Sequence, residues 1–117
     1  MLVGVPREVK NHEYRVAITP AGVHELVSHG HEVFIEKDAG VGSSIPDADF
    51  QAAGAQILAT ADDVWVTGDL ILKVKEPVEQ EYGRMREGQT LFTYLHLAAD
   101  KRLTEELVAR KVTGIAY

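Results

Sequence analysis

The chain has 117 residues, of which 45% are hydrophobic and 26% are charged, and its formal net charge at pH 7 is −6. This composition predicts one soluble globular domain with a real core, and the negative charge argues against nucleic acid as a partner, because nucleic-acid binding normally needs a basic face. The absence of cysteine excludes disulfides and thiolate chemistry. No apolar run is long enough to cross a bilayer and residues 1–10 do not resemble a signal peptide, so we expect a cytoplasmic protein without membrane contact.

Short apolar runs alternate with amphipathic stretches along the chain, which is the pattern of a parallel sheet with helices on its faces. In chain order we expect strands at residues 2–6, 31–36, 55–59, 69–74, 90–96 and 113–117. Helices are expected to begin after Thr19, at Asp47, after Thr60 and after Asp100. This order predicts an α/β domain with helices on both faces of a parallel sheet, a three-layer fold of the flavodoxin-like or Rossmann-like kind.

The first helix carries clear boundary signals. Thr19 is a good N-cap, and a proline follows it at the first helical position. One apolar face is expected from Val23, Leu26 and Val27, and Gly30 should end the helix.

Two later helices also show an apolar face. Val64 and Trp65 should face the sheet from the helix that follows Thr60, where Thr60 and Asp63 resemble a capping box. In the last helix we expect a buried stripe formed by Leu103, Leu107 and Val108. The sequence stops at Tyr117, directly after a strand and with no closing helix, and we therefore expect the domain to be interrupted there.

The stretch LILKVKEP, residues 70–77, begins as a buried strand and then carries two lysines, Lys73 and Lys75. Burying an unpaired ammonium group costs several kcal/mol, so each lysine must reach water or face an anion. Regular alternation along a strand would put both lysines on the same face. We interpret Lys73 as a structural side chain, either solvated or ion-paired.

Three cationic or titratable groups follow predicted strand ends, where open parallel sheets bind their ligands. Arg15 lies in the loop after the first strand, Lys75 ends the fourth and His96 ends the fifth. Arg15 offers a planar fork for a carboxylate, Lys75 a point charge, and His96 a proton donor or acceptor near neutral pH. A small carboxylate with a reactive carbonyl or amine would suit these three groups. A lone histidine at a strand end is more often structural, so that alternative stays open for His96.

Two other motifs are weaker. The segment AGVGSS, residues 39–44, would need glycine at position 45 to match a dinucleotide loop, but Ile45 stands there, and a tight turn is the simpler interpretation. The histidines at positions 24, 29 and 31 have no carboxylate or cysteine at ligand spacing. We therefore assign no cofactor-binding residue and no metal ligand in this chain.

Three segments carry a resemblance to a known family. The opening VGVPREVKNHEYRVAITPAGV (3–23), the segment ILKVKEP (71–77) and the segment YLHLAAD (94–100) resemble, in this order, the N-terminal signatures of the alanine dehydrogenase and pyridine nucleotide transhydrogenase family. The resemblance covers essentially the whole chain. It is closest to the alanine dehydrogenase branch, because the transhydrogenase branch shares the opening but keeps neither the histidine of the third segment nor the Lys-Glu pair of the second.

This resemblance implies an NAD-dependent enzyme that interconverts L-alanine with pyruvate and ammonium, assembled as a homo-oligomer. It implies that Arg15 and Lys75 hold the substrate carboxylate and carbonyl oxygen, and that Lys75 and His96 are catalytic, His96 as the acid/base group. Residues 1–117 would be the N-terminal part of the substrate-binding domain. The dinucleotide-binding domain, with its glycine-rich fingerprint and a further catalytic aspartate, is absent, so we expect the isolated chain to be inactive.

Two alternatives remain open at this point. The chain is either part of such an enzyme or a stand-alone module that binds a small carboxylate or a partner protein without catalysis. Within the family, it is also compatible with the N-terminal part of a transhydrogenase alpha subunit.

Overall fold

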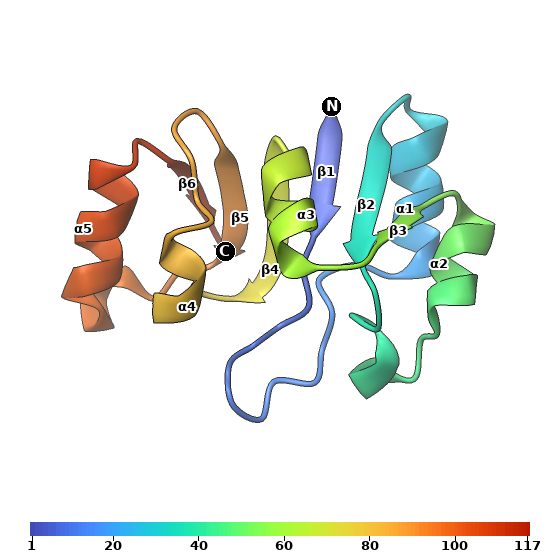
Figure 1. Ribbon diagram of the computed structural model, residues 1–117, viewed down its shortest axis with the longest axis horizontal. Helices are drawn as coiled ribbons and strands as arrows, with labels where there is room; N and C mark the ends of the chain where they lie inside the picture. The colour runs from blue at the N-terminus through green and yellow to red at the C-terminus, as the bar shows by residue number, and fades with distance from the viewer.

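The structure is a computed structural model that describes all residues, 1–117. Its six strands form one parallel sheet in the order β3-β2-β1-β4-β5-β6 (Figure 1). The strands are β1 (Leu2–Val5), β2 (Glu32–Glu36), β3 (Gln56–Leu58), β4 (Leu70–Lys75), β5 (Thr90–Tyr94) and β6 (Thr113–Ala116). Every predicted strand is therefore present, and the main difference is that β5 ends at Tyr94 and not at residue 96.

Five helices and two short 3₁₀ turns connect the strands. They are α1 (Pro20–Ser28), η1 (Val41–Ser43), α2 (Asp47–Ala53), α3 (Ala61–Thr67), α4 (Glu79–Tyr82), η2 (Leu97–Ala99) and α5 (Lys101–Ala109). The sequence did not indicate α4, because this helix is a single turn whose N-cap residue, Val78, has no side-chain acceptor.

The predicted starts of three helices are confirmed by side-chain caps. The hydroxyl of Thr19 accepts a hydrogen bond from the N–H of Gly22 at 3.1 Å, and that of Thr60 accepts one from Asp63 at 3.1 Å. The carboxylate of Asp100 accepts the N–H of Leu103 at 2.9 Å. Each cap satisfies an amide that has no partner inside its own helix.

The sheet separates two hydrophobic cores, which makes the fold three-layered. On one face, α1 and α2 contribute Val23 and Phe50 to a core with residues of β1 and β2. On the other face, α3, α4 and α5 contribute Trp65, Tyr82 and Leu103 to a core with residues of β4 and β5. Helices on both faces of a parallel sheet confirm the predicted fold class.

One core prediction was wrong. In α5, Leu103 and Leu107 are buried as expected, but the side chain of Val108 is 73% exposed. Residues four apart lie on the same face of a helix, whereas Val108 is rotated about 100° from Leu107 and points to solvent.

The strand order reverses between β1 and β4, the two central strands. From β1 the chain proceeds to β2 and β3 on one side, and β4 is followed by β5 and β6 on the other, which is the Rossmann order. The long loop between β1 and α1 extends beyond the carboxyl ends of the strands, at the bottom of Figure 1. Ligands of such sheets bind in the crevice at this reversal.

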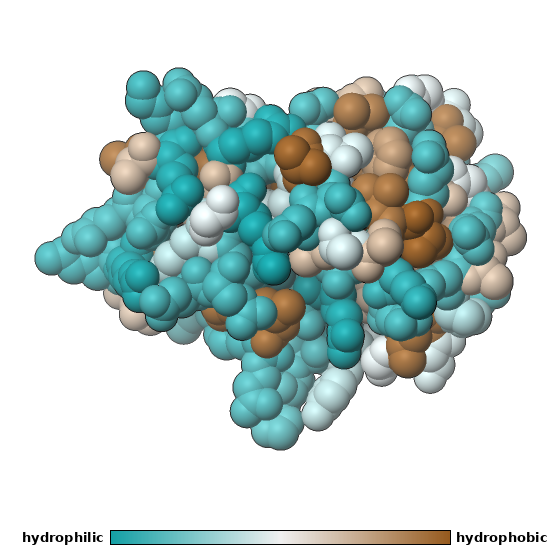
Figure 2. All heavy atoms as spheres, in the orientation of Figure 1, coloured by the Kyte–Doolittle hydropathy of each residue, from teal (hydrophilic) through white to brown (hydrophobic).

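The two halves of the molecule differ in surface character. In the view of Figure 2, hydrophobic atoms gather over the half that contains β3 and α2, whereas the half with α4 and α5 is mainly hydrophilic. No helix of the protein is long and apolar enough to span a membrane.

The edge of the sheet at β5 and β6 carries exposed apolar side chains. On β5, Leu91 and Thr93 point into the core under α5, and the alternate residues Phe92 and Tyr94 are exposed. Ile115 of β6 is exposed as well, and Tyr117 packs edge-on against Phe92 with ring centroids 5.2 Å apart. Contiguous exposed apolar surface of this kind favours association.

We expect the isolated 117-residue chain to self-associate through this strip. Sedimentation velocity over a range of concentrations should show concentration-dependent association, and the double substitution Phe92→Ser with Ile115→Thr should weaken it. Val108→Ser is the matched control, because Val108 is an exposed aliphatic residue on α5. A concentration-independent monomer for the unmodified chain would contradict this prediction.

Candidate functional site

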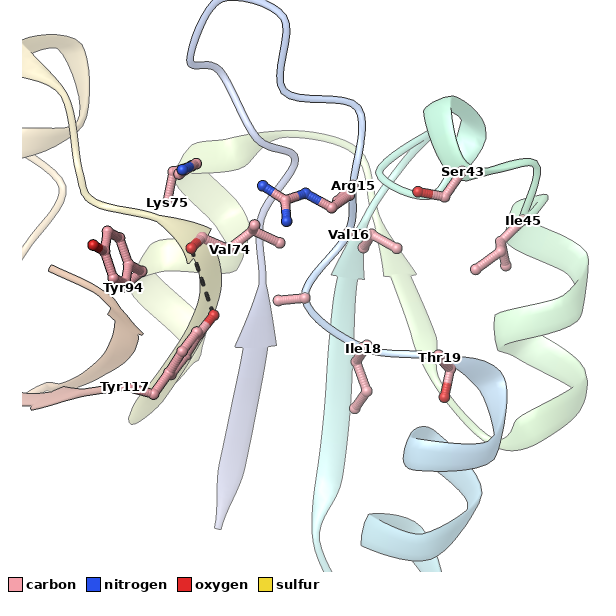
Figure 3. Close-up of a pocket in the computed structure, with 11 residues that line it drawn as sticks. Arg15, Val16, Ile18, Thr19, Ser43, Ile45, Val74, Lys75, Tyr94 and Tyr117 are labelled. Atoms are coloured by element: carbon pink, nitrogen blue, oxygen red, sulfur yellow. Dashed lines mark hydrogen bonds between the residues drawn. The ribbon is translucent and has the colours of Figure 1, made fainter. Parts of the chain in front are cut away.

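A cavity of about 610 Å³ lies beyond the carboxyl ends of the central strands. It is lined by Arg15, Val16, Ala17, Ile18, Thr19, Ser43, Ile45, Val74, Lys75, Tyr94 and Tyr117. Figure 3 shows Lys75, Tyr94 and Tyr117 on one side of it, Val16, Ile18 and Ile45 on the other, and Arg15 between them. A concave, mostly apolar site with a few convergent polar groups is the usual form of a small-molecule site.

Arg15 and Lys75 both line this cavity, so the structure brings together two of the three residues singled out in the sequence. The guanidinium group of Arg15 points toward the end of β4 (Figure 3). The ammonium group of Lys75 lies 5.4 Å from the centroid of the Tyr94 ring, a cation–π arrangement. Two cations therefore border one cavity, which suits an anionic ligand.

Glu13 holds Arg15 in a two-pronged ion pair. The Nε of Arg15 donates to Oε2 of Glu13 at 2.9 Å and its Nη2 donates to Oε1 at 2.7 Å, while the backbone N–H of Arg15 also donates to Oε2 at 3.0 Å. The side-chain hydrogen bond from Arg15 is the main reason that the pKa of Glu13 is lowered to about 2. Because the folded-state pKa is depressed, the stabilisation is fully present above the ordinary pKa and is lost progressively as pH falls from there through about 2.

This ion pair leaves part of the guanidinium group available. Glu13 occupies the edge formed by Nε and Nη2, and the end formed by Nη1 and Nη2 still carries donors. The side chain of Arg15 is 65% exposed, so its orientation depends on this contact more than on packing. Glu13 thus fixes Arg15 and takes two of its five side-chain N–H donors, so three remain available to an anionic ligand.

His96 does not line the cavity but lies next to it. It follows the end of β5 with left-handed backbone angles, φ 51° and ψ 42°, and is exposed. Its ring centroid lies 5.6 Å from that of Tyr94, which does line the cavity. Left-handed angles are uncommon outside glycine, although histidine is among the residues that adopt them more readily. The third sequence candidate is therefore separated from the cavity by one aromatic ring.

A β-bulge in β4 sets the direction of Lys75. Leu72 pairs with Phe92 and Lys75 pairs with Tyr94, so β4 advances three residues where β5 advances two. An extra residue of this kind reverses the alternation of side chains. Lys75 consequently shares a face with Tyr94, while Lys73 lies on the opposite face. The expectation that alternation puts both lysines on one face was wrong for this reason.

Lys73 is buried between two carboxylates. Its side chain is 1% exposed, and its Nζ lies 3.1 Å from Oε1 of Glu8 and 3.2 Å from Oε2 of Glu81. Of the two possibilities expected for Lys73, solvated or ion-paired, the structure shows the ion pair. Burial raises the pKa of Glu81 because it removes hydration from the carboxylate, and the positive charge of Lys73 opposes this shift.

Sequence reasoning missed several residues around the site. Neither Glu8 nor Glu13 was singled out, and the aromatic wall of Tyr94 and Tyr117 was not expected. The hydroxyl of Tyr117 donates to the carbonyl oxygen of Lys73 at 2.8 Å. One signal was available, because a lysine inside an apolar strand requires a buried anion, but the sequence does not say which of 18 acidic residues supplies it.

The segment AGVGSS forms a tight turn that supports the loop of Arg15. A Cβ at Gly42 would lie 2.6 Å from the carbonyl oxygen of Tyr14, so only glycine fits at this close approach. The hydroxyl of Ser43 donates to the same oxygen at 2.9 Å. Residues Val41–Ser43 form a single 3₁₀ turn, and Tyr14 packs closely against Gly42, as the interpretation of this segment as a tight turn predicts.

The histidines at positions 29 and 31 have other partners. The Nδ1 of His29 lies 2.8 Å from the carbonyl oxygen of Glu25, and the Nδ1 of His31 lies 3.3 Å from the N-terminal amine. No three histidine or acidic side chains of the protein are grouped so that they could hold a metal ion.

Fold and site together define an α/β domain in which two cationic side chains line one cavity at the strand-order reversal. The comparison with known families is specific. Residues 4–117 match the family described as alanine dehydrogenase/PNT, N-terminal domain, and the chain belongs to this family.

Curated relatives are similar over the whole of this chain. An alanine dehydrogenase of Mycolicibacterium smegmatis is 66% identical over 117 residues, and one of Mycobacterium tuberculosis is 62% identical. Both alignments cover 100% of this chain and 32% of the relative. The chain therefore spans about a third of the length of the curated relatives that it matches.

Solved structures give the same relationship. The chain superimposes on an L-alanine dehydrogenase with a TM-score of 0.98 at 50% identity, which covers 100% of this chain and 32% of the other. It superimposes on a transhydrogenase from Sinorhizobium meliloti with a TM-score of 0.92 at 32% identity, which covers 99% and 33%.

The two lysines of β4 should differ in their effect on stability. We expect Lys73→Gln to lower the free energy of unfolding by about 3 kcal/mol, because it leaves two buried carboxylates without their ammonium partner. Lys75→Gln is the matched control and should change it by less than about 0.5 kcal/mol, because this side chain reaches the cavity. Urea denaturation of both variants would measure the difference, and equal losses would contradict the burial described for Lys73.

Proposed function

We propose that this chain is the N-terminal substrate-binding part of an NAD-dependent L-alanine dehydrogenase, which converts L-alanine, water and NAD to pyruvate, ammonium and NADH. The observation that carries the proposal is that Arg15 and Lys75 line one cavity at the strand-order reversal. Membership of the family and the 50–66% identity to alanine dehydrogenases support it.

In this proposal the two cations divide the substrate between them. The free donors of Arg15 bind the carboxylate of alanine or pyruvate in a two-pronged arrangement. Lys75 lies beside the carbonyl oxygen, where its charge stabilises the negative charge that develops on that oxygen as the carbon is reduced. The aliphatic wall of Val16 and Ile18 gives the methyl group of the substrate an apolar surface.

His96 is proposed as the group that moves protons. Oxidation of an amino acid to an imine, followed by addition of water, needs proton transfers at nitrogen and oxygen, and a positioned imidazole typically contributes roughly 10²- to 10⁴-fold to such steps. The ring of His96 lies against Tyr94, which borders the cavity. A small movement of this exposed side chain would bring it to a substrate held by Arg15 and Lys75.

In this proposal NAD is held by residues outside this chain, because residues 1–117 contain no G-x-G-x-x-G fingerprint. When bound, the nicotinamide supplies the hydride acceptor of the reaction. We further propose that the parent enzyme is a cytoplasmic homo-oligomer, as the resemblance implies.

A transhydrogenase alpha subunit is the second candidate. The similarity to the Sinorhizobium meliloti transhydrogenase favours it, but the identity is 32%, against 50% for the solved alanine dehydrogenase. The two candidates predict different reactions, because one consumes an amino acid and the other moves hydride between nucleotides. A stand-alone carboxylate-binding module is the third candidate and would bind a small carboxylate without turnover.

The parent enzyme should form NADH from L-alanine and NAD, and the isolated 117-residue chain should not, because it lacks a cofactor site. The absorbance of NADH would measure the reaction with the parent enzyme and with the isolated chain. NADH formation by the isolated chain would contradict the division of the site proposed here. A parent protein that reduces a second nucleotide but leaves L-alanine unchanged would favour the transhydrogenase.

Substitutions of the three site residues in the parent enzyme should have different effects on kinetics. Arg15→Lys should mainly weaken pyruvate binding, by roughly 1–3 kcal/mol, because the charge stays and the fork is lost. Lys75→Gln should lower kcat as well as affinity. His96→Gln should keep part of the binding, lose turnover and flatten the pH profile near neutrality. Steady-state kinetics over a range of pH would separate the three, and an unchanged kcat for His96→Gln would exclude its role.

A further inference from the structure

We propose that Glu8 is a positioning residue that aims Lys75 into the cavity by holding the bulge of β4. This inference rests on the proposed function, because it concerns the geometry of a proposed substrate-binding lysine. Glu8 lies in the loop after β1, 67 residues from Lys75 in the sequence, and it does not line the cavity of Arg15 and Lys75.

The carboxylate of Glu8 contacts three consecutive residues of β4. Its Oε1 accepts from Nζ of Lys73 at 3.1 Å and from the backbone N–H of Lys75 at 3.0 Å, and its Oε2 accepts from the backbone N–H of Val74 at 3.2 Å. The side chain of Glu8 is only 2% exposed. One buried carboxylate therefore accepts three donors from the segment that forms the bulge.

These contacts explain how the bulge is maintained. In a regular strand, successive N–H groups point to opposite edges, whereas Val74 and Lys75 both direct theirs to Glu8. The irregular amides of a bulge need acceptors, because an unpaired buried N–H is costly. β1 is paired with β4 only as far as Ile71, so beyond that point the carboxylate of Glu8 takes the place of the neighbouring strand.

Glu8 is itself fixed by the charge on its other side. Lys73 is turned into the core by the bulge and forms its ion pair with Glu8 at 3.1 Å, while Glu81 of α4 lies 3.2 Å from the same ammonium group. Lys10, two residues after Glu8, pairs with Glu76, just after β4. The loop after β1 is thus attached to β4 on both sides of Lys75.

The consequence is that Glu8 acts on Lys75 through the backbone. If the bulge relaxed to regular alternation, Lys75 would turn away from Tyr94 and the cavity. A displacement of about 1 Å in a positioned group can cost on the order of 10²-fold in rate. Glu81 also pairs with Lys73, but the backbone N–H groups of Val74 and Lys75 donate to Glu8 and not to Glu81. Glu81 is therefore a matched comparison for Glu8.

The test is a double-mutant cycle in the parent enzyme, read as kcat/KM for pyruvate. Glu8→Gln should lower kcat/KM by about 10- to 100-fold in the wild-type background. In a Lys75→Gln background it should have an effect of less than about 3-fold, because the group that it positions is already absent. In an Arg15→Lys background it should keep its full effect. A merely structural role would lower activity equally in all three backgrounds, and that result would overturn the inference.

Hydrogen exchange of the parent protein supplies a readout that does not depend on activity. The amides of Val74 and Lys75 should exchange faster in Glu8→Gln than in the Glu81→Gln control, which should also keep kcat/KM within about 3-fold. Unchanged exchange would overturn the inference even in an active enzyme, whereas an inactive unmodified parent would overturn the proposed function instead. If Glu8→Gln does not fold, Glu8→Asp serves in the same cycle, because it keeps the charge for Lys73 but its shorter side chain cannot reach all three donors.

Discussion

The buried ammonium group of Lys73 is the constraint on which the site geometry depends. A charge that is 1% exposed is tolerated only with well-placed anions, and Glu8 and Glu81 supply them from two separate elements. The loop after β1 must therefore reach β4, and α4 must pack close enough to bring Glu81 to Lys73. Because the loop that brings Glu8 also contains Arg15, the same ion pair that satisfies Lys73 brings the loop of Arg15 to the end of β4.

The loop after β1 supplies an acidic partner for each side of the site. Glu13 fixes the direction of Arg15 through its side chain, and Glu8 contacts the backbone of Lys75. In both cases the carboxylate leaves other N–H donors of the cation free, since Glu13 takes one edge of the Arg15 guanidinium and Glu8 takes no donor of the Lys75 ammonium. The loop thus provides orientation without neutralising the charge that an anionic ligand would meet.

The sequence predicted the parts of the fold that depend on local signals. Thr19, Thr60 and Asp100 cap helices as their residue types indicate, and the six apolar runs form the six strands. The bulge could not be predicted in the same way. A strand pattern read from the sequence assumes regular alternation, and the carboxylate that stabilises the extra residue of the bulge belongs to Glu8, more than 60 positions away. Without the bulge, alternation would put Lys73 and Lys75 on one face, which is why that arrangement was expected. The cavity residues Arg15 and Lys75 could be predicted because each lies at or beyond the carboxyl end of a predicted strand.

The site consists of a fixed part and an exposed part. Arg15 and the backbone of Lys75 are held by contacts that lie entirely within residues 1–117, so the geometry of the two cations is a property of this domain. His96, by contrast, is exposed in a left-handed conformation and rests against the ring of Tyr94. The proposed binding of an anion and the proposed transfer of a proton therefore make different demands on the fold. The proposed anion site needs only the loop after β1 and the bulge of β4, whereas the proposed proton transfer also needs a contact that orients the imidazole of His96.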